Sequence, residues 1–217
     1  MAKEKLAVTI WNYKGGVGKT TISLMLSETA ERQGLKVLAI DLDEQRNLSE
    51  ALKLSHENFP SIEIRTELKP EYADEDFDFY IIDTHPTKDE TIKSAIQFAD
   101  IVLIPVLPDY LSIINLRSVF EYVKSCGIGA EQAAIVKNAV TELKVSSEIE
   151  SVLEEQGYPS AGRLPRNNIL VRNIASGESW DKFMRPSNRE PFAQLYAHVW
   201  KAYIRMLSGN FYDIWRE

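Results

Sequence analysis

The chain has 217 residues, of which 44% are apolar and 26% charged, and its 25 Lys and Arg against 32 Asp and Glu give a net charge of −7. This length predicts one domain over residues 1–217, or at most two small ones, and the composition excludes a predominantly disordered chain. The longest apolar run, residues 101–107, is interrupted by Pro105 and is far shorter than the roughly 20 residues that cross a bilayer.

The first residues lead directly into an alternating apolar segment, without the apolar stretch and cleavage site of a signal peptide. The single cysteine, Cys126, allows no internal disulfide and no cysteine-based metal site. We therefore expect a cytoplasmic protein in which Cys126 is a partly buried residue late in a helix.

Short β-branched runs alternate with longer amphipathic stretches as far as Gln156, a pattern typical of repeated βα units. The predicted strands are residues 6–11, 36–40, 79–82, 101–106 and 133–137, with 62–64 as a further candidate. The predicted helices are residues 20–33, 87–98, 112–124 and 146–156. We therefore expect an α/β fold with a doubly wound, mostly parallel sheet flanked by helices.

After Gly157 the pattern is irregular until a final helix, whose start is signalled by Ser187 and Glu190 at the spacing of a capping box. The apolar stripe of this helix predicts packing against the core. A membrane-surface helix is the alternative, which the mildly basic character of the segment and the non-basic residues 209–217 disfavour. The stripe consists of Phe192, Leu195, Tyr196, Val199, Tyr203, Met206 and Leu207.

Residues 12–21, with the sequence NYKGGVGKTT, follow the first predicted strand and lead into a helix. Glycines let backbone N–H groups curl around an anion, and the helix N-terminus adds partial positive charge. Lys19 would reach the β and γ phosphates, the Thr20 hydroxyl would ligate Mg²⁺, and Thr21 would lie beside the α phosphate. The segment therefore predicts a nucleotide-phosphate site formed by Gly15, Gly16, Val17, Gly18, Lys19, Thr20 and Thr21.

Two positions depart from the common phosphate loop: Tyr13 stands where its first glycine is expected, and a second lysine, Lys14, lies at its mouth. We expect the charge of Lys14 to face outward, toward nucleotide held by another subunit. Here the sequence resembles the ParA/MinD family of deviant P-loop ATPases, whose signature lysine acts across a nucleotide-sandwich dimer. The resemblance implies that ATP with Mg²⁺ is bound, that ATP drives homodimer formation, and that Lys14 and Lys19 are catalytic.

Residues 37–47, VLAIDLDEQRN, resemble the second motif of this family, although Glu44 replaces its usual proline. The resemblance implies that Asp43 orients the attacking water and that Asp41 supports the magnesium environment. Positioning is sufficient for such a carboxylate, because the loose transition state mainly demands geometry and charge neutralisation. Taken without the phosphate loop, the two carboxylates favour a solvated turn.

Residues 77–86, FDFYIIDTHP, resemble the Walker B strand of the family, so that Asp83 would hold magnesium through water. Its place at the carboxyl end of an apolar strand agrees with this role. His85 replaces a proline and is interpreted as a loop residue, with nucleotide sensing or a dimer contact as the alternative.

Three further segments extend the resemblance. Residues 99–109 are similar to a family stretch on the nucleotide side of the sheet. Asn138 corresponds to an asparagine that reads the adenine edge, and Pro165 to a proline that packs near the base. A purely structural role is the alternative for both.

Charge is unevenly distributed along the chain. Residues 160–210 contain eight Lys or Arg against three Asp or Glu, a net charge of +5, which leaves −12 for the remainder. The resemblance implies non-specific binding of double-stranded DNA by the ATP dimer, and a solvated face with scattered arginines is the alternative. The candidate DNA contacts are Arg163, Arg166, Arg172, Lys182, Arg185 and Arg189.

Within the family the sequence looks most like the small plasmid-type ParA proteins, often called ParF-like, because the segment before Walker B is short and no N-terminal helix-turn-helix is present. This implies a slow ATP hydrolase for plasmid or chromosome partition, stimulated by a ParB-like centromere-binding protein and nucleoid-associated when ATP-bound. One alternative is a MinD-like membrane or scaffold positioning ATPase, which the missing basic C-terminal tail disfavours. Another is a small-molecule P-loop kinase or ligase, which would not need Lys14.

Overall fold

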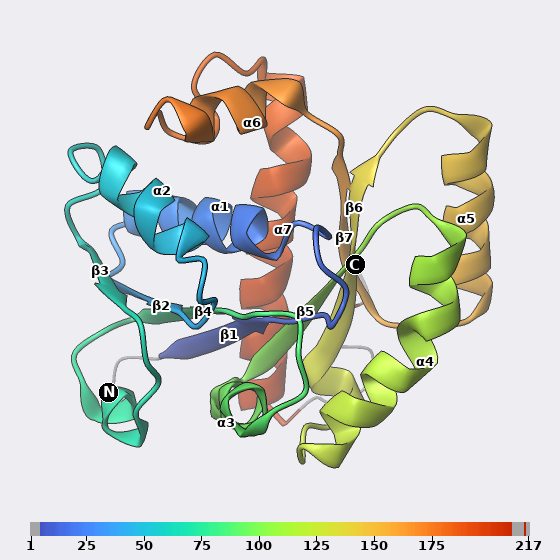
Figure 1. The fold of residues 1–217 in the computed structure, drawn as a ribbon, viewed down its shortest axis with the longest axis horizontal. Coiled ribbons are helices and arrows are strands. Elements are labelled where there is room, and N and C mark those ends of the chain that lie inside the picture. The colour runs from blue at the N-terminus through green and yellow to red at the C-terminus, as the bar shows by residue number, and fades with distance from the viewer. Residues whose placement is uncertain (1–4, 210–214, 216–217) are drawn as a thin grey trace.

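The computed structural model describes residues 5–209 and Trp215, and its centre is a seven-stranded parallel sheet (Figure 1). In space the strand order is β3-β2-β4-β1-β5-β6-β7. The α/β fold with a doubly wound parallel sheet is thus confirmed. The strands are β1 (Leu6–Ile10), β2 (Val37–Asp41), β3 (Ile62–Arg65), β4 (Phe79–Asp83), β5 (Ile101–Val106), β6 (Ala133–Val140) and β7 (Ser160–Pro165).

The strand register determines which residues meet at the carboxyl edge of the sheet. Asp83 at the end of β4 lies opposite Ile10 of β1 on one side and opposite Asp41 of β2 on the other. Since all three strands are parallel, the loop after β1 and these two carboxylates come to the same edge. The reversal of strand order beside β1 is where open α/β sheets bind ligands.

Helices cover both faces of the sheet (Figure 1). One layer contains α1, α2, α6 and α7, which share an apolar core with Leu6, Val8 and Ile10 of β1. The opposite layer contains α3, α4 and α5. The bounds are α1 (Lys19–Arg32), α2 (Asn47–Ser55), α3 (Glu90–Phe98), α4 (Tyr110–Ser125), α5 (Lys144–Glu155), α6 (Asn168–Ala175) and α7 (Pro186–Leu207).

The final helix α7 packs against the core, as predicted from its apolar stripe. Phe192, Leu195 and Val199 are at most 1% exposed, and burial of each such side chain contributes roughly 1.5–3 kcal/mol. Leu207, at the end of the stripe, is instead exposed. The expected capping box is wrong: the helix begins at Pro186, so Ser187 lies inside the first turn, and Arg185 at the N-cap makes no side-chain capping bond.

Two α-helices and one strand were not predicted from the sequence. Helix α2 follows the second motif, and strand β7 and helix α6 occupy the segment after Gly157 that looked irregular. Strand β7 contains glycine, arginine and proline, and it pairs with β6 through two register shifts. Its strand conformation therefore depends on tertiary pairing rather than on intrinsic propensity. The candidate strand at 62–64 is confirmed as β3.

Cys126 is the C-cap of α4, which agrees with its expected place at the end of a helix. Its side chain is 3% exposed and thus buried, rather than partly buried as predicted. Over the described residues, no helix is both long enough and apolar enough to span a membrane.

Candidate functional site

The loop between β1 and α1 has the backbone of an anion cradle. Gly16 and Gly18 have φ angles of +71° and +94°, a region that L side chains rarely adopt. Gly18 is the N-cap of α1, and a Cβ on it would lie 2.1 Å from Nδ2 of Asn138. The amide of Asn138 donates to the carbonyl of Val17 at 2.8 Å. The loop therefore has two glycines where backbone geometry requires them, at the start of a helix whose free N–H groups attract anions.

Lys19 begins α1 and is only 7% exposed. Its Nζ donates to the carbonyl of Lys14 at 3.3 Å. Burial lowers the pKa of Lys19, while the charges of Asp83 and Asp43 act in the opposite direction. A phosphate in this loop would offset the cost of burying the ammonium group, which fits the predicted role of Lys19. Thr21, two residues further along, is half-buried.

Asp83 is fully buried, and both of its oxygens accept hydrogen bonds from α1. Oγ1 of Thr20 donates to Oδ2 at 2.7 Å, and Oγ of Ser23 donates to Oδ1 at 3.1 Å. Burial raises the pKa of Asp83 to about 7, helped by the charge of Asp41 and opposed by the two hydroxyls and Lys19. A cation beside this carboxyl group would stabilise its charged form.

The oxygen donors of Thr20 and Asp83 are the chemistry that Mg²⁺ prefers, and this ion commonly takes only one or two protein ligands. Among the residues that the structure describes, no group of three or more His, Cys, Asp or Glu side chains could hold a metal by itself. A divalent ion at this position would therefore depend on phosphate and water oxygens. The residues present fit a nucleotide-bound Mg²⁺ ion.

Asp41 is fully buried and holds the loop that leads into α2. Its Oδ2 accepts from both the backbone N–H and the hydroxyl of Ser49 at 2.8 Å, and its Oδ1 accepts from the N–H of Asp43 at 3.2 Å. This loop-organising role was not predicted. Support of the magnesium environment stays a prediction for Asp41.

Asp43 is half-buried and lies in the turn between β2 and α2. Its Oδ1 accepts from the N–H of Gln45 at 2.9 Å, whereas Oδ2 has no hydrogen-bond partner within residues 5–209 and Trp215. The negative charge of Asp43 raises the pKa of Lys19. The geometry leaves one oxygen of Asp43 free to bind water.

Lys14 does not face outward as expected. Its Nζ donates to both carboxylate oxygens of Asp109, at 2.9 and 2.7 Å, and to Oγ of Ser112 at 2.9 Å. Asp109 is the N-cap of α4. Burial alone would raise the pKa of Asp109, but the hydrogen bonds from Lys14 and Ser112 outweigh it and hold this pKa below its usual value. Opposite charge and capping geometry explain why the amine turns back toward α4.

Asn138 and Pro165 lie at the carboxyl ends of β6 and β7. In this structure the Asn138 amide contacts the phosphate loop itself. Pro165 lines an open cleft of about 580 Å³ together with Thr141, Arg163 and Arg166. Their predicted adenine contacts stay predictions.

The six candidate DNA contacts fall into two groups. Arg163, Lys182 and Arg189 form ion pairs with Glu150, Glu178 and Asp181, respectively. The other three are exposed and have no acidic partner in the described part of the chain. These are Arg166, Arg172 and Arg185, in or beside α6 and at the start of α7.

Sequence reasoning missed Asp109, Ser112 and Ser23 as parts of the site. Asp109 could have been found, because Asp followed three residues later by Ser at a helix start is a capping signal. Ser23 carries no such signal, since one turn of helix separates it from Lys19 and only the packing against β4 brings it to Asp83.

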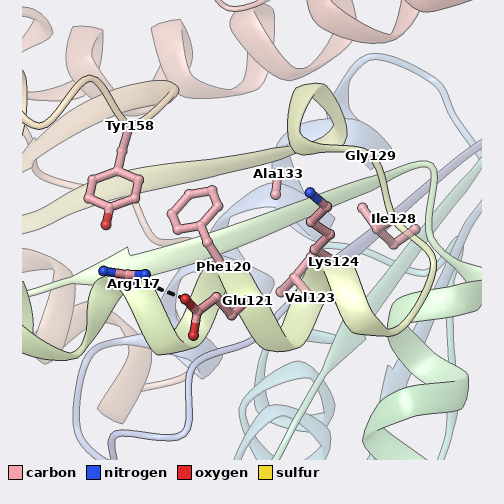
Figure 2. Close-up of a pocket in the computed structure, with 9 residues that line it drawn as sticks. All are labelled: Arg117, Phe120, Glu121, Val123, Lys124, Ile128, Gly129, Ala133 and Tyr158. Atoms are coloured by element: carbon pink, nitrogen blue, oxygen red, sulfur yellow. Dashed lines mark hydrogen bonds and ion pairs between the residues drawn. The ribbon is translucent and has the colours of Figure 1, made fainter.

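A separate apolar pocket of about 180 Å³ lies beside the C-terminal half of α4 (Figure 2). The rings of Phe120 and Tyr158 stack there with centroids 4.8 Å apart, and Arg117 pairs with Glu121 at 2.9 Å. Ala133 is the first residue of β6, and Tyr158 lies two residues before the start of β7. The pocket is therefore at the amino ends of these parallel strands. It is therefore at the opposite edge of the sheet from the phosphate loop.

The fold and the loop geometry together define a nucleotide-binding protein of the P-loop class. The family model for the CobQ/CobB/MinD/ParA nucleotide-binding domain matches residues 8–180. The chain belongs to this family of ATPases, and the resemblance to ParA/MinD proteins is confirmed.

Individual relatives support the same assignment. The chain is 27% identical over 168 residues to the virulence plasmid ParA family protein pGP5-D of Chlamydia muridarum, which covers 56% of this chain and 62% of that protein. It thus spans less than two thirds of that relative's length. It is 25% identical to the maintenance of carboxysome distribution protein A of Halothiobacillus neapolitanus, over 80% of this chain and 85% of that protein.

A solved structure with the same fold is that of a plasmid partition protein from Borrelia burgdorferi bound to AMPPNP. Its TM-score is 0.73 at 18% identity, and the match covers 91% of this chain and 98% of that chain.

Proposed function

We propose that this chain is a single-domain ATP hydrolase that switches between a monomer and an ATP-sandwich homodimer and acts in plasmid or chromosome partition. The observation that supports it most is the cluster of Lys19, Thr20 and Asp83 around a glycine cradle, with the second lysine, Lys14, at the mouth of the loop. Membership of the ParA/MinD family and the likeness to plasmid ParA proteins point to the same activity.

In the proposed reaction, water attacks the γ phosphate of ATP, and ADP and phosphate leave. Backbone N–H groups between Gly15 and Thr21 would hold the phosphates, and Lys19 would neutralise the β and γ oxygens. Thr20 and Asp83 would hold Mg²⁺, which supplies charge neutralisation on the phosphate oxygens when bound. The free oxygen of Asp43 would orient the attacking water.

Lys14 would complete the site across the dimer. In the structure the amine of Lys14 is paired with Asp109. To reach nucleotide in a second subunit, Lys14 must exchange this carboxylate for the phosphates of that nucleotide. The phosphates of a bound nucleotide carry more negative charge than one carboxylate, which favours that exchange. Hydrolysis removes the γ phosphate and would return Lys14 to Asp109.

The ligand that we assign to the ATP-bound dimer is double-stranded DNA. Arg166, Arg172 and Arg185 are exposed and lie in the segment with the +5 net charge, where no described acidic side chain neutralises them. Each dimer would present two copies of this surface, and the number of neutralised phosphates sets the strength and salt dependence of non-specific binding. A ParB-like centromere-binding protein would stimulate the slow hydrolysis and release the dimer from the nucleoid.

The experiment is the binding of an arbitrary-sequence DNA duplex, measured by fluorescence anisotropy with ATP and Mg²⁺, with ADP and Mg²⁺, and without nucleotide. We expect binding only with ATP, weakening steeply as salt rises, because phosphate contacts release counterions. Lys19→Ala should abolish binding through loss of nucleotide, and Lys14→Ala through loss of the dimer. Equal binding in all three nucleotide states, or ATP-dependent binding to lipid vesicles but not to DNA, would refute the proposal.

A further inference from the structure

Phe183 is an exposed aromatic residue in an unusual backbone conformation. Its side chain is 63% exposed, and its φ angle is +66°. A positive φ is rare for a bulky L residue and strains the backbone. Because the side chain of Phe183 is exposed, burial of the ring does not offset this strain. The residue lies in the segment that connects α6 to α7, residues 176–185, which we name the connecting segment.

The exposure of Phe183 does not result from a loosely held segment. Trp180 and Met184, on either side, are both 3% exposed. The N–H of Trp180 donates to Oε2 of Glu28 on α1 at 3.0 Å, and Asp181 pairs with Arg32 of α1 at 2.7 Å. The connecting segment is thus anchored to α1, the helix that starts at the phosphate loop, and it holds the ring in solvent.

Two cationic side chains lie over the ring of Phe183. The guanidinium carbon of Arg172 lies 5.7 Å from the ring centroid, and Nζ of Lys182 lies 5.3 Å from it. Arg185, two residues further along, is exposed. Lys182 also pairs with Glu178, whereas Arg172 and Arg185 meet no acidic side chain among the described residues. An exposed apolar ring held beside cations can contact sugars or bases while the cations bind phosphates.

We propose that Phe183 is a direct DNA contact, which packs its ring against deoxyribose and base edges in a groove of the duplex while Arg172, Lys182 and Arg185 bind the flanking phosphates. The inference rests on the proposed function and extends it, because the DNA surface then includes an apolar contact as well as charge. Two predictions separate the two kinds of contact. The contact of the ring is apolar, so its contribution to DNA affinity should not change with salt concentration. The contribution of each arginine comes from its charge and should decrease as salt concentration rises.

The test compares Phe183→Asn with the wild-type protein in ATP and Mg²⁺, over a series of KCl concentrations. Asparagine tolerates positive φ and removes the ring, so the variant should fold with an unchanged or higher Tm. We expect about tenfold weaker DNA binding at every salt concentration, with the same slope of log affinity against log salt. Arg185→Ala should instead reduce that slope by about one.

Two control variants accompany this comparison. Phe183→Tyr keeps a ring and should keep wild-type affinity. Leu207→Asn removes another exposed apolar side chain, at the far end of α7, and should leave DNA binding unchanged.

Wild-type affinity in Phe183→Asn, or equal loss in Leu207→Asn, would overturn the inference and leave the proposed function standing. A steeper or shallower salt slope in Phe183→Asn would also overturn it, because the ring would then act through the phosphate contacts. Failure of the wild-type protein to bind DNA in any nucleotide state would overturn both proposals.

Discussion

Among single residues, Gly15 and Gly18 both belong to the glycine motif of the phosphate loop, but they differ in the space around them. A Cβ on Gly15 would meet no atom within 4 Å, and this residue has an ordinary φ. A Cβ on Gly18 would meet Nδ2 of Asn138 at 2.1 Å, and the φ angle there is +94°. The requirement for glycine therefore differs between them, which spacing alone does not reveal.

We predict that Gly18→Ala lowers the free energy of unfolding by about 2 kcal/mol, because it strains the backbone and displaces the Asn138 amide from Val17. Gly15→Ala should change stability by less than about 0.5 kcal/mol. Urea unfolding without nucleotide measures both variants. An equal loss in the two glycine variants would show that the crowding at Gly18 is not the cause.

At the level of elements, helix α1 links the phosphate loop to the connecting segment through a buried acid. Glu28 is fully buried and accepts from the N–H of Trp180, while its Oε1 has no hydrogen-bond partner in the described structure. Burial raises the pKa of Glu28 to about 7, with a smaller contribution from Asp181. The hydrogen bond from the N–H of Trp180 and the charge of Arg32 oppose this rise.

The sign of the pH dependence follows from this raised pKa. Between pH 4.5 and about 7 the folded state keeps a proton that the unfolded chain loses, so Glu28 makes the protein less stable as pH rises through this window. The full effect is on the order of 3 kcal/mol. We predict that Glu28→Gln, which has no charge, is more stable than the wild-type protein at pH 8 and differs little from it at pH 5.

Urea unfolding of both proteins at the two pH values measures this difference. Asp83 also has a raised pKa but is present in both proteins, so its contribution cancels. The same stability difference at pH 5 and pH 8 would contradict the assignment.

Elements also show where sequence reasoning succeeds. The five main strands are buried runs of branched residues, a pattern that burial on both faces of a parallel sheet imposes, so they could be predicted. Strand β7 and helix α6 could not, because β7 lies at the edge of the sheet and depends on pairing with β6. In the candidate site, too, local patterns could be predicted and long-range contacts could not. The spacing of the phosphate loop indicates Lys19 and Thr20, and the end of an apolar strand indicates Asp83. The bond of Lys14 to Asp109 joins residues 95 positions apart, and no local pattern encodes it.

For the whole molecule, the central claim is that ATP converts the monomer into a dimer completed by Lys14. Asp43→Ala should trap this dimer, since nucleotide binding survives while water positioning is lost. The most direct measurement is sedimentation velocity of Asp43→Ala, alone and combined with Lys14→Ala, in ATP and Mg²⁺ or in ADP and Mg²⁺. We predict a dimer for the single variant in ATP only, and monomers for the double variant although it still binds ATP. A single variant that stays monomeric in ATP, or a dimer that persists without Lys14, would contradict the account.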